Sequence, residues 1–371
     1  MKVCMIAPIP PFRGGIAKYC HSLAQELEAR HEQLLLSYLR QYPRLLYGST
    51  PQQDPACSIA KVRNEFSRVS FEIDSVRPST WLAALHRIYD FSPDIVIFPW
   101  WTTYWTPLYA WLMGRLRKRG ISCLILCINV YEHEDSALKK LLTRFILRQA
   151  DLLIAHSEQE LLELRNINRG ATIRKQLLPI FNYNYSLPTR SGGSTLHLLF
   201  FGFVRPYKGL DTLFHALTLV KELDVELKVV GEFWSDNKEY RSLIRDLDIY
   251  GRVEIDDRYV SEEEMVRYFA WSDVVVLPYR AAKTSGVIAT AYGFGRPVLA
   301  TDVGGFKEVV QDKCTGKLVR AGDPQAIADG IAWFYHNREI DFADNISKFV
   351  TQRMSWGSLV NTIEEMVTNG G

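Results

Sequence analysis

Lys2-Val-Cys-Met-Ile-Ala7 is a short apolar run that ends at a group of prolines. Runs of this kind are typical of strands buried in the middle of a parallel sheet. The turn Pro11-Phe-Arg-Gly-Gly15 follows, and after it apolar residues recur at the spacing of one helix face, at Ile16, Tyr19, Cys20, Leu23 and Leu27. The opening of the chain therefore predicts a strand, a glycine turn and a helix, which is the repeating unit of α/β proteins.

The alternation of strands and helices continues along the chain. In the first half the pattern predicts strands at 94–98, 122–127 and 152–155, with helices at about 105–119 and 136–149 between them. Residues 179–195 are rich in Asn, Pro, Ser and Gly, which is a linker composition. A second set then predicts strands at 196–201, 225–230, 274–278 and 297–300, a helix at 211–221, and another helix that a capping box opens at Ser261. Two such units predict two doubly wound α/β domains that face each other across a cleft.

Length and composition narrow the class of protein. The chain has 371 residues, of which 47% are hydrophobic and 23% charged, and its net charge is +2. These values exclude a disordered chain, a collagen-like fibre and a disulfide scaffold, and they give no overall basic field for nucleic acid. The six cysteines are scattered without a second pair to complete a zinc site, and the first apolar run is too short for a signal peptide. We therefore expect a reducing, cytoplasmic location and no nucleic-acid partner.

One segment, Ile95–Met113, has no charge, holds four tryptophans and is followed by four basic residues within 115–119. Its length would suit a transmembrane helix, but Pro99 and Pro107 interrupt it, so we expect a strand, a loop and a helix instead. Packing in the core and against helices explains some of the tryptophans, and two further interpretations of them and of the basic residues stay open. They suit a lipid-bearing acceptor and peripheral contact with the inner face of a membrane, and aromatic rings stack equally well on sugars.

Gly14 and Gly15 end the first predicted turn. Glycines there let the backbone approach a ligand closely, and the helix that follows favours an anion at its N-terminus. A tight turn that needs glycine for its geometry explains the pair equally well. The dinucleotide-binding pattern Gly-x-Gly-x-x-Gly is absent, which argues against a nicotinamide-dependent dehydrogenase.

Two further loops follow predicted strands in the second half of the chain. In Phe200-Phe-Gly-Phe-Val-Arg-Pro-Tyr-Lys-Gly209, Arg205 and Lys208 lie three residues apart, where ligands bind in α/β sheets. An arginine can hold a phosphate through two hydrogen bonds and a lysine acts as a mobile charge, so the pair suits a diphosphate. Two solvated surface charges would give the same pattern. Thr284, Ser285 and Gly286 begin another predicted helix, where free backbone N–H groups form a second anion site.

Taken together, these motifs resemble the retaining glycosyltransferases of family 4, which have the GT-B fold. The residues that carry the resemblance are Gly14-Gly15, Asp151-Leu-Leu-Ile-Ala-His-Ser157, Arg205 with Lys208-Gly209, Ser285-Gly286, Gly295-x-Pro297-Val298, Gly304-Gly305 and Ser355-Trp356. The resemblance implies two Rossmann-like domains, here 1–180 and 190–355, with the last helix, 356–371, crossing back to complete the first. It also implies transfer of a sugar from a nucleotide donor with retention of configuration, without a cofactor or a bound metal.

The resemblance implies roles for individual residues as well. Arg205 and Lys208 would clamp the donor diphosphate, and Gly15 would touch the phosphate or the transferred sugar from the opposite domain. The remaining residues that would bind the nucleotide sugar are Gly14, Gly202, Thr284, Ser285, Gly286, Val287 and Thr290.

The sequence departs from the family pattern in two places. Many members carry two glutamates eight residues apart, and Ala282 and Thr290 occupy those positions here. The chain resembles instead a sub-branch with a Ser-Gly-Val loop, in which backbone amides and hydroxyls must replace the acids. Where that sub-branch usually has a first histidine, the chain has Ile128, and His133-Glu134 remains of the motif that follows.

His133, with Glu134 beside it, is the histidine that we single out as a catalytic candidate. It follows a predicted strand, and adjacent acids could orient it. A solvated loop histidine has the same sequence context. Asp246-Leu-Asp248 lies near the end of a predicted amphipathic helix, so we interpret it as a polar helix face and expect no metal site.

The sequence thus predicts a metal-independent hexosyltransferase of polysaccharide biosynthesis, with UDP-glucose as the first-choice donor and GDP-mannose as the second. The expected acceptor is a growing polysaccharide or a lipid-linked saccharide. Because no carboxylate stands where a nucleophile would be needed, we favour same-face attack assisted by the departing phosphate over a glycosyl-enzyme intermediate. Two other classes stay open, a non-catalytic relic that binds a nucleotide sugar and a nucleotide-sugar epimerase.

Overall fold

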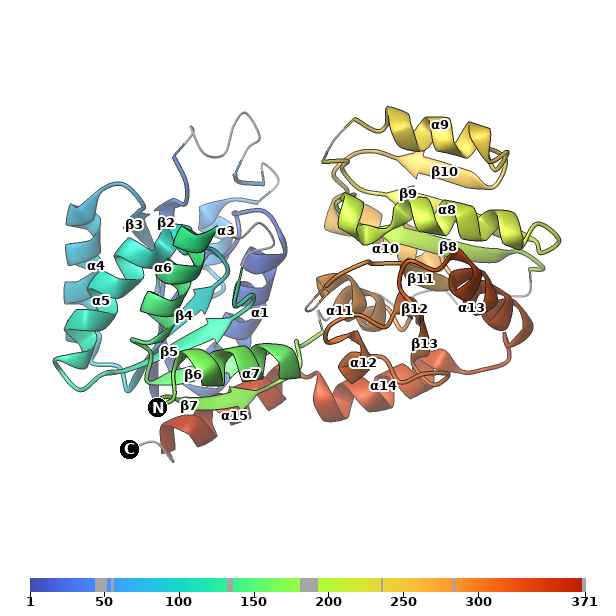
Figure 1. The fold of residues 1–371 in the computed structure, drawn as a ribbon. Helices are drawn as coiled ribbons and strands as arrows, with labels where there is room; N and C mark the ends of the chain where they lie inside the picture. Colours follow the sequence, from blue (N-terminus) through green and yellow to red (C-terminus); the bar gives the residue numbers. More distant parts are fainter. Residues whose placement is uncertain are drawn as a thin grey trace. The chain divides into compact units, whose positions relative to one another are not determined.

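The computed structural model describes residues 1–43, 52–54, 57–131, 136–180, 193–234, 236–282 and 285–368. The chain divides into two compact units (Figure 1). Unit 1 comprises Met1–Leu177 and Trp356–Gly371, and unit 2 comprises Leu178–Ser355. The sequence-based boundaries are 180 and 356, and most of the expected linker, 181–192, lies outside the described residues.

Unit 1 is built on a seven-stranded sheet in which every pairing is parallel. The strand order is β3-β2-β1-β4-β5-β6-β7, and its central strands are buried almost throughout, as in a sheet covered on both faces. The strands are β1 (Lys2–Ile6), β2 (Glu32–Arg40), β3 (Val69–Asp74), β4 (Ile95–Trp100), β5 (Ser122–Cys127), β6 (Leu152–Ala155) and β7 (Thr172–Lys175).

The helices of unit 1 include the last helix of the chain. α1 (Gly15–Arg30) packs against α15 (Trp356–Thr368), where Arg30 forms an ion pair with Glu364 at 2.9 Å. α4 (Pro78–Phe91), α5 (Thr106–Arg117) and α6 (Ala137–Leu147) lie side by side in one layer (Figure 1). The remaining helices are α3 (Ile59–Arg63), η1 (Thr103–Trp105) and α7 (Glu158–Ile167).

Unit 2 repeats this plan on a six-stranded parallel sheet with the order β10-β9-β8-β11-β12-β13. Its strands are β8 (Leu196–Phe201), β9 (Val225–Val230), β10 (Val253–Asp256), β11 (Val274–Leu277), β12 (Val298–Thr301) and β13 (Gly316–Val319). Its helices are η2 (Pro206–Lys208), α8 (Leu210–Leu219), α9 (Lys238–Asp246), α10 (Glu262–Trp271), α11 (Gly286–Gly293), α12 (Phe306–Val309), α13 (Pro324–His336) and α14 (Phe342–Arg353). The predicted capping box is confirmed at the start of α10, where Ser261 and Glu264 each bond to the other's backbone.

Each sheet has one place where the direction of strand addition reverses. It lies between β1 and β4 in unit 1 and between β8 and β11 in unit 2. The loops that leave two such strands diverge, which opens a crevice outside their carboxyl ends, and ligands of open α/β sheets bind there. The topology therefore directs attention to the loops after these four strands.

The tryptophan-rich segment belongs to the core of unit 1. β4, η1 and α5 follow one another there, as the predicted strand, loop and helix. Trp100 and Trp105 are buried in the hydrophobic cluster, whereas Trp101 and Trp111 are half-buried at its edge. Core packing therefore accounts for Trp100 and Trp105, and the membrane and sugar interpretations of the other two tryptophans and the basic residues stay predictions. Among the residues described, no helix combines the length and the apolarity needed to cross a bilayer.

Candidate functional site

The loop after β8 begins against the loop after β9. Gly202 has a positive φ of 92° and donates its N–H to the Val230 carbonyl at 2.9 Å. Gly231 has a φ of 137°, and a Cβ at that position would lie 2.5 Å from the Gly202 carbonyl oxygen. Gly231 needs glycine because the two backbones pass so close to one another, and Gly202 favours it because its φ is positive. This contact fixes the path of the chain that leads to Arg205.

The same loop is then pressed against the loop after β11. η2 ends at Gly209, whose φ is 67°, and α8 begins directly after it. A Cβ on Gly209 would lie 2.1 Å from the backbone oxygen of Pro278. Because a real Cβ never comes so close to a backbone oxygen, glycine at this position lets η2 sit between β8 and β11. Lys208, the last residue of η2, is thereby held at the crevice.

Lys208 is a buried cation for which the described residues supply no carboxylate partner. Its side chain is only 7% exposed, and its ammonium lies 5.4 Å from the centre of the Tyr279 ring. Burial, together with repulsion from Arg205, lowers the pKa of Lys208 to about 8, and no acid among the described residues opposes the shift. A buried charge that nothing neutralises favours an anionic ligand over an empty site.

The Lys208 ammonium faces residues of two other segments. A Cβ placed on Gly202 would lie 3.6 Å from the Lys208 Nζ and 3.7 Å from a methyl group of Val287. Gly202 therefore leaves a small space between the β8 loop and the first turn of α11. Three of the sequence-predicted site residues, Gly202, Lys208 and Val287, are brought together at this point.

Arg205 lies on the open side of the same loop. Its guanidinium carbon is 4.1 Å from the centre of the Trp234 ring, in a cation–π arrangement. Trp234 follows β9 and is 66% exposed, so this face of the loop is open to solvent. Arg205 and Lys208 thus present one half-buried and one buried cation at the same crevice. Sequence reasoning missed Trp234, since only the pairing of β9 with β8 brings it to this loop.

The N-terminus of α11 contributes the second predicted anion site. Ser285 is the N-cap, and its hydroxyl accepts a hydrogen bond from the Val287 N–H at 3.2 Å. Gly286, the first helical residue, is exposed, while Thr290, one turn later, is buried. Thr284 lies outside the described residues. The first turn of α11 and Lys208 therefore flank the same edge of the sheet.

Arg280 links the two loops of the site and was not assigned a role from the sequence. Its guanidinium donates to the Pro206 carbonyl at 2.9 Å and pairs with the Asp211 carboxylate. Its backbone N–H donates to the Tyr207 carbonyl at 2.7 Å. Arg280 therefore fixes η2 from the β11 side. Its position directly after a predicted strand was the one signal for this role that the sequence carried.

In unit 1, the predicted glycines lie after β1. Gly14 is the N-cap of α1 with a φ of 102°, a conformation that L side chains rarely adopt, and Gly15 is the first helical residue. No heavy atom within 4 Å would meet a Cβ at either position in the described part of the chain. Space therefore exists for a ligand beside the start of α1. His133 and Glu134 lie outside the described residues.

The crevice between β1 and β4 is bordered by aromatic side chains. Trp101, Tyr42 and Tyr104 are half-buried, and the Trp101 indole N–H donates to the Tyr42 hydroxyl at 3.0 Å. They cover Trp105, whose buried indole N–H has no hydrogen-bond partner among the residues described. Partly exposed aromatic rings at the carboxyl ends of strands are suited to stacking on a sugar ring.

No cluster that could hold a metal ion is found in the described part of the chain, where no group of three His, Cys, Asp or Glu side chains converges. The Asp246-Leu-Asp248 string lies at the end of α9, and Asp248 has a positive φ of 53°. This position agrees with its interpretation as a polar helix end.

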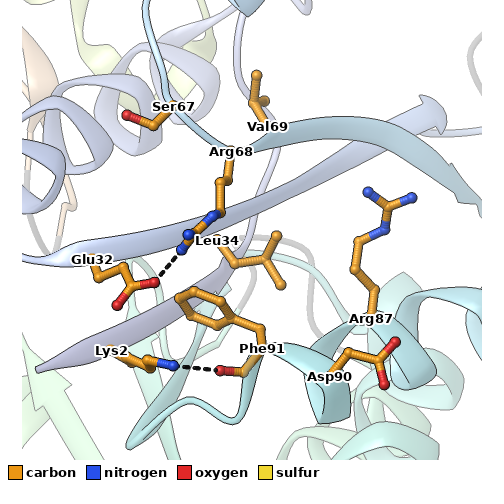
Figure 2. A pocket seen from close by; sticks show the side chains of 9 residues that line it. All are labelled: Lys2, Glu32, Leu34, Ser67, Arg68, Val69, Arg87, Asp90 and Phe91. Carbon is orange, nitrogen blue, oxygen red and sulfur yellow. Dashed lines mark hydrogen bonds and ion pairs between the residues drawn. The ribbon is translucent and has the colours of Figure 1, made fainter.

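A separate cavity of about 460 Å³ lies at the amino ends of the unit 1 strands, away from both crevices (Figure 2). Its three cations already have partners: Lys2 donates to the Phe91 carbonyl at 3.4 Å, Arg68 pairs with Glu32, and Arg87 pairs with Glu72 at 3.2 Å. The lining residues are Lys2, Glu32, Leu34, Ser67, Arg68, Val69, Arg87, Asp90 and Phe91. A hollow whose cations already have partners is a weaker candidate for an anionic ligand than the Lys208 crevice.

Two families of domains match consecutive parts of the chain. Residues 14–176 match the glycosyl transferase 4-like domain, and residues 195–337 match the glycosyl transferases group 1. A D-inositol 3-phosphate glycosyltransferase of Pseudarthrobacter chlorophenolicus is 33% identical over 152 residues, which are 38% of this chain and 34% of the relative. A GDP-mannose:glycolipid 4-beta-D-mannosyltransferase of Xanthomonas campestris is 27% identical over 197 residues, 52% of this chain and 53% of the relative. The chain thus spans between a third and about half of the length of these relatives.

Solved structures match the whole chain at lower identity. HepE of Anabaena, determined in complex with UDP, has a TM-score of 0.75 at 17% identity, and the match covers 100% of both chains. Sucrose-phosphate synthase from Thermosynechococcus elongatus has a TM-score of 0.69 at 17% identity, covering 99% of this chain and 98% of that one. These matches, with the two parallel sheets, establish the α/β GT-B fold.

Proposed function

Residues 14–176 and 195–337 are the two domains of a family 4-type glycosyltransferase with the GT-B fold, and from this premise we propose that the chain moves a hexose from a nucleotide donor to a saccharide acceptor. The observation that carries the proposal is Lys208, a buried cation at the crevice between β8 and β11 that has no acidic partner in the part of the chain that the structure describes. A donor diphosphate supplies the negative charge that this position lacks.

The chemistry follows from that charge. When the bond between the sugar and the diphosphate breaks, negative charge grows on the leaving phosphate. Lys208, Arg205 and the first turn of α11 would stabilise it electrostatically, so that a bound metal is not required. With Ala282 and Thr290 in place of two acids, we favour retention through same-face attack, in which the departing phosphate assists the acceptor hydroxyl. Gly15 would approach the transferred sugar. His133 would be the catalytic histidine of unit 1, with Glu134 beside it to orient it.

We propose UDP-glucose as the first donor to test and GDP-mannose as the second. HepE, which shares the fold, was solved with UDP and with UDP-glucose, and the Xanthomonas relative is named for GDP-mannose. Lys208 and the first turn of α11 would bind the diphosphate that both donors share.

The acceptor we propose is a saccharide, carried on a polysaccharide or on a lipid. The half-buried rings of Trp101, Tyr42 and Tyr104 support a sugar ring at the unit 1 crevice. The Xanthomonas relative is named for a glycolipid acceptor. A cytoplasmic enzyme with peripheral contact to the inner face of a membrane would meet such an acceptor.

A panel of nucleotide sugars tests this function. In the presence of EDTA, the protein should slowly release UDP and free sugar from UDP-glucose, or GDP from GDP-mannose, and an acceptor should accelerate the release. Mass spectrometry of the nucleotides and sugars distinguishes the alternatives. Binding without release would identify a non-catalytic relic, an isomerised sugar on intact nucleotide would identify an epimerase, and activity restored only by manganese would contradict the metal-independent chemistry.

Donor affinity should fall as pH rises through 8. The pKa of Lys208 is lowered to about 8, so in the free protein the side chain loses its charge above that pH. Because a bound diphosphate favours the charged form, UDP affinity should decrease by up to about tenfold for each further pH unit. Calorimetric titrations with UDP between about pH 7 and about pH 10 measure this slope.

Lys208→Arg is the matched control, because an arginine keeps its charge over the whole range. Its affinity for UDP should stay nearly constant as pH rises. A wild-type affinity that is equally constant would contradict the assignment of the diphosphate to Lys208.

A further inference from the structure

Helix α6 carries an unusual group of exposed apolar side chains. Leu138 and Leu141 are each 64% exposed and Phe145 is 52% exposed. Their spacing of three and four residues places all three on one face of the helix. Large apolar residues exposed singly are normal on a protein surface, but a cluster marks an interaction site. Among the described residues, no other helix exposes three large apolar side chains.

Basic side chains border this apolar stripe. Lys140 and Arg144 on α6 are exposed, Arg148 at its C-cap is exposed and donates to the Ile167 carbonyl, and residues 136–150 contain no acid. Within the part of the chain that the structure describes, no carboxylate forms an ion pair with Lys140 or Arg144. The acidic residues at 132, 134 and 135 precede the helix in the sequence and lie outside that part.

The neighbouring helix extends the basic border. α5 packs against α6, and three exposed basic residues lie at its C-terminal end: Arg115 in its last turn, and Lys118 and Arg119 just after it. Arg115 lies 3.8 Å from the ring centre of Trp111, and Arg119 lies 3.7 Å from that of Tyr89. Neither side chain is neutralised by an acid in these contacts. The layer of α4, α5 and α6 in Figure 1 thus has an apolar stripe beside a concentration of positive charge, in a chain whose net charge is only +2.

We propose that the exposed face of α6 docks unit 1 on an anionic lipid bilayer. A helix lying flat on a membrane buries its apolar side chains at the level of the headgroups and places its cations against anionic lipids. Leu138, Leu141 and Phe145 are the inserting side chains, and Lys140 and Arg144 meet the headgroups. An acidic or purely apolar protein partner would use one of these features, whereas an anionic bilayer uses both.

This proposal deepens the proposed function, on which it rests for the lipid-linked acceptor. Docking through α6 would hold unit 1, which we propose binds the acceptor, at the surface where a lipid-linked saccharide is found. It also moves the membrane contact from the tryptophan-rich segment, of which Trp100 and Trp105 are buried, to a helix that the sequence did not single out.

Vesicle sedimentation with the full chain tests the proposal. The wild type should bind vesicles that contain about one-third phosphatidylglycerol, bind pure phosphatidylcholine at least about tenfold more weakly, and release the anionic vesicles in high salt. The triple variant Leu138→Ser/Leu141→Ser/Phe145→Ser should bind the anionic vesicles at least about tenfold more weakly. Leu219→Ser is the matched control, since Leu219 is 51% exposed on α8 of unit 2, and it should bind like the wild type.

A second variant, Lys140→Gln/Arg144→Gln, keeps the proposal testable if the triple variant does not fold. It should lose the salt-sensitive part of the vesicle binding. Wild-type protein that ignores anionic vesicles, or a triple variant that binds them as well as the wild type, would overturn the proposal. So would a wild-type dimer that the triple variant converts to monomer without any vesicle binding. UDP titration of the same samples separates the two proposals: normal UDP affinity without vesicle binding rejects only the α6 surface, and vesicle binding without UDP affinity rejects the proposed function.

Discussion

Lys208→Met should weaken UDP binding about 30-fold or more while making the free protein more stable. The loss of affinity follows from the removal of a charged hydrogen-bond donor at the diphosphate, which is worth about 2 kcal/mol. Methionine has a similar length and no charge, so it fills the space beside Gly202 and Tyr279 without creating a large cavity. Transfer from any nucleotide sugar should fall with the donor affinity.

The gain in stability comes from removing a buried charge that destabilises the folded protein. The folded-state pKa of Lys208 is lowered to about 8 from an ordinary value of 10.5, so the unfolded chain holds the proton more tightly than the folded one. Below pH 8 this difference destabilises the fold, and the penalty disappears as pH rises from 8 to 10.5. A shift of this size corresponds to about 3 kcal/mol at neutral pH. Lys208→Met should therefore raise the free energy of unfolding by about 2 kcal/mol, and the Tm by several degrees.

Calorimetry and thermal unfolding at neutral pH measure both effects on one preparation. Lys238→Met is the control, because Lys238 on α9 is highly exposed and pairs only with its neighbour Asp236 in the described contacts. It should change neither UDP affinity nor stability. A Lys208→Met protein that binds UDP normally, or that is less stable than the wild type, would show that Lys208 is a structural cation and not a ligand-binding one.

Gly209→Ala should destabilise unit 2 by about 3–5 kcal/mol. The new Cβ would lie 2.1 Å from the backbone oxygen of Pro278, so either η2 or the loop after β11 must move. The φ of 67° adds the strain of a left-handed conformation, about 1–2 kcal/mol for a residue with a Cβ. Because Lys208 is the preceding residue, donor affinity should fall as well.

Gly322→Ala separates the two contributions to that loss. Gly322 has nearly the same φ, 70°, but no atom of the described residues would lie within 4 Å of its Cβ. This control should therefore lose only the strain of the left-handed conformation, about 1–2 kcal/mol. Urea unfolding of both variants gives the comparison. Equal losses would mean that the conformation alone requires glycine at 209, and that the contact between the two loops does not hold η2 in place.

The strands that the sequence predicts differ from those it misses in their position in the sheets. β1, β4, β5, β6, β8, β9, β11 and β12 are recognised from apolar runs, and these are inner strands. The four edge strands are β3, β7, β10 and β13, and each carries polar or charged residues that break the run, as Glu72 and Asp74 do in β3. Edge strands contact one neighbour and solvent, so their sequences lack the signal. β2 is an inner strand that was missed despite the apolar residues Leu34–Leu36.

The residues of the candidate site also divide into those that the sequence identifies and those that it does not. Arg205 and Lys208 are found from the sequence because they belong to one short segment after a predicted strand. The burial of Lys208 is not, since it depends on Tyr279, which reaches it through the pairing of β8 with β11. Trp234 and Arg280 come from the loops after β9 and β11, and only the order of the strands brings them to η2. Contacts between segments distant in sequence are therefore the part that a single sequence does not reveal.

The central claim is that a nucleoside diphosphate binds against Lys208, and proton uptake during UDP binding tests it most directly. At pH 8 about half of the Lys208 side chains are neutral, and a bound diphosphate would protonate them. Calorimetric titrations in buffers of different ionisation enthalpy should therefore show uptake of about half a proton per UDP in the wild type. Lys208→Arg should bind UDP with uptake near zero, and the phosphate groups of UDP, already ionised at this pH, contribute little. UDP binding to the wild type without proton uptake would contradict the claim and place the diphosphate elsewhere.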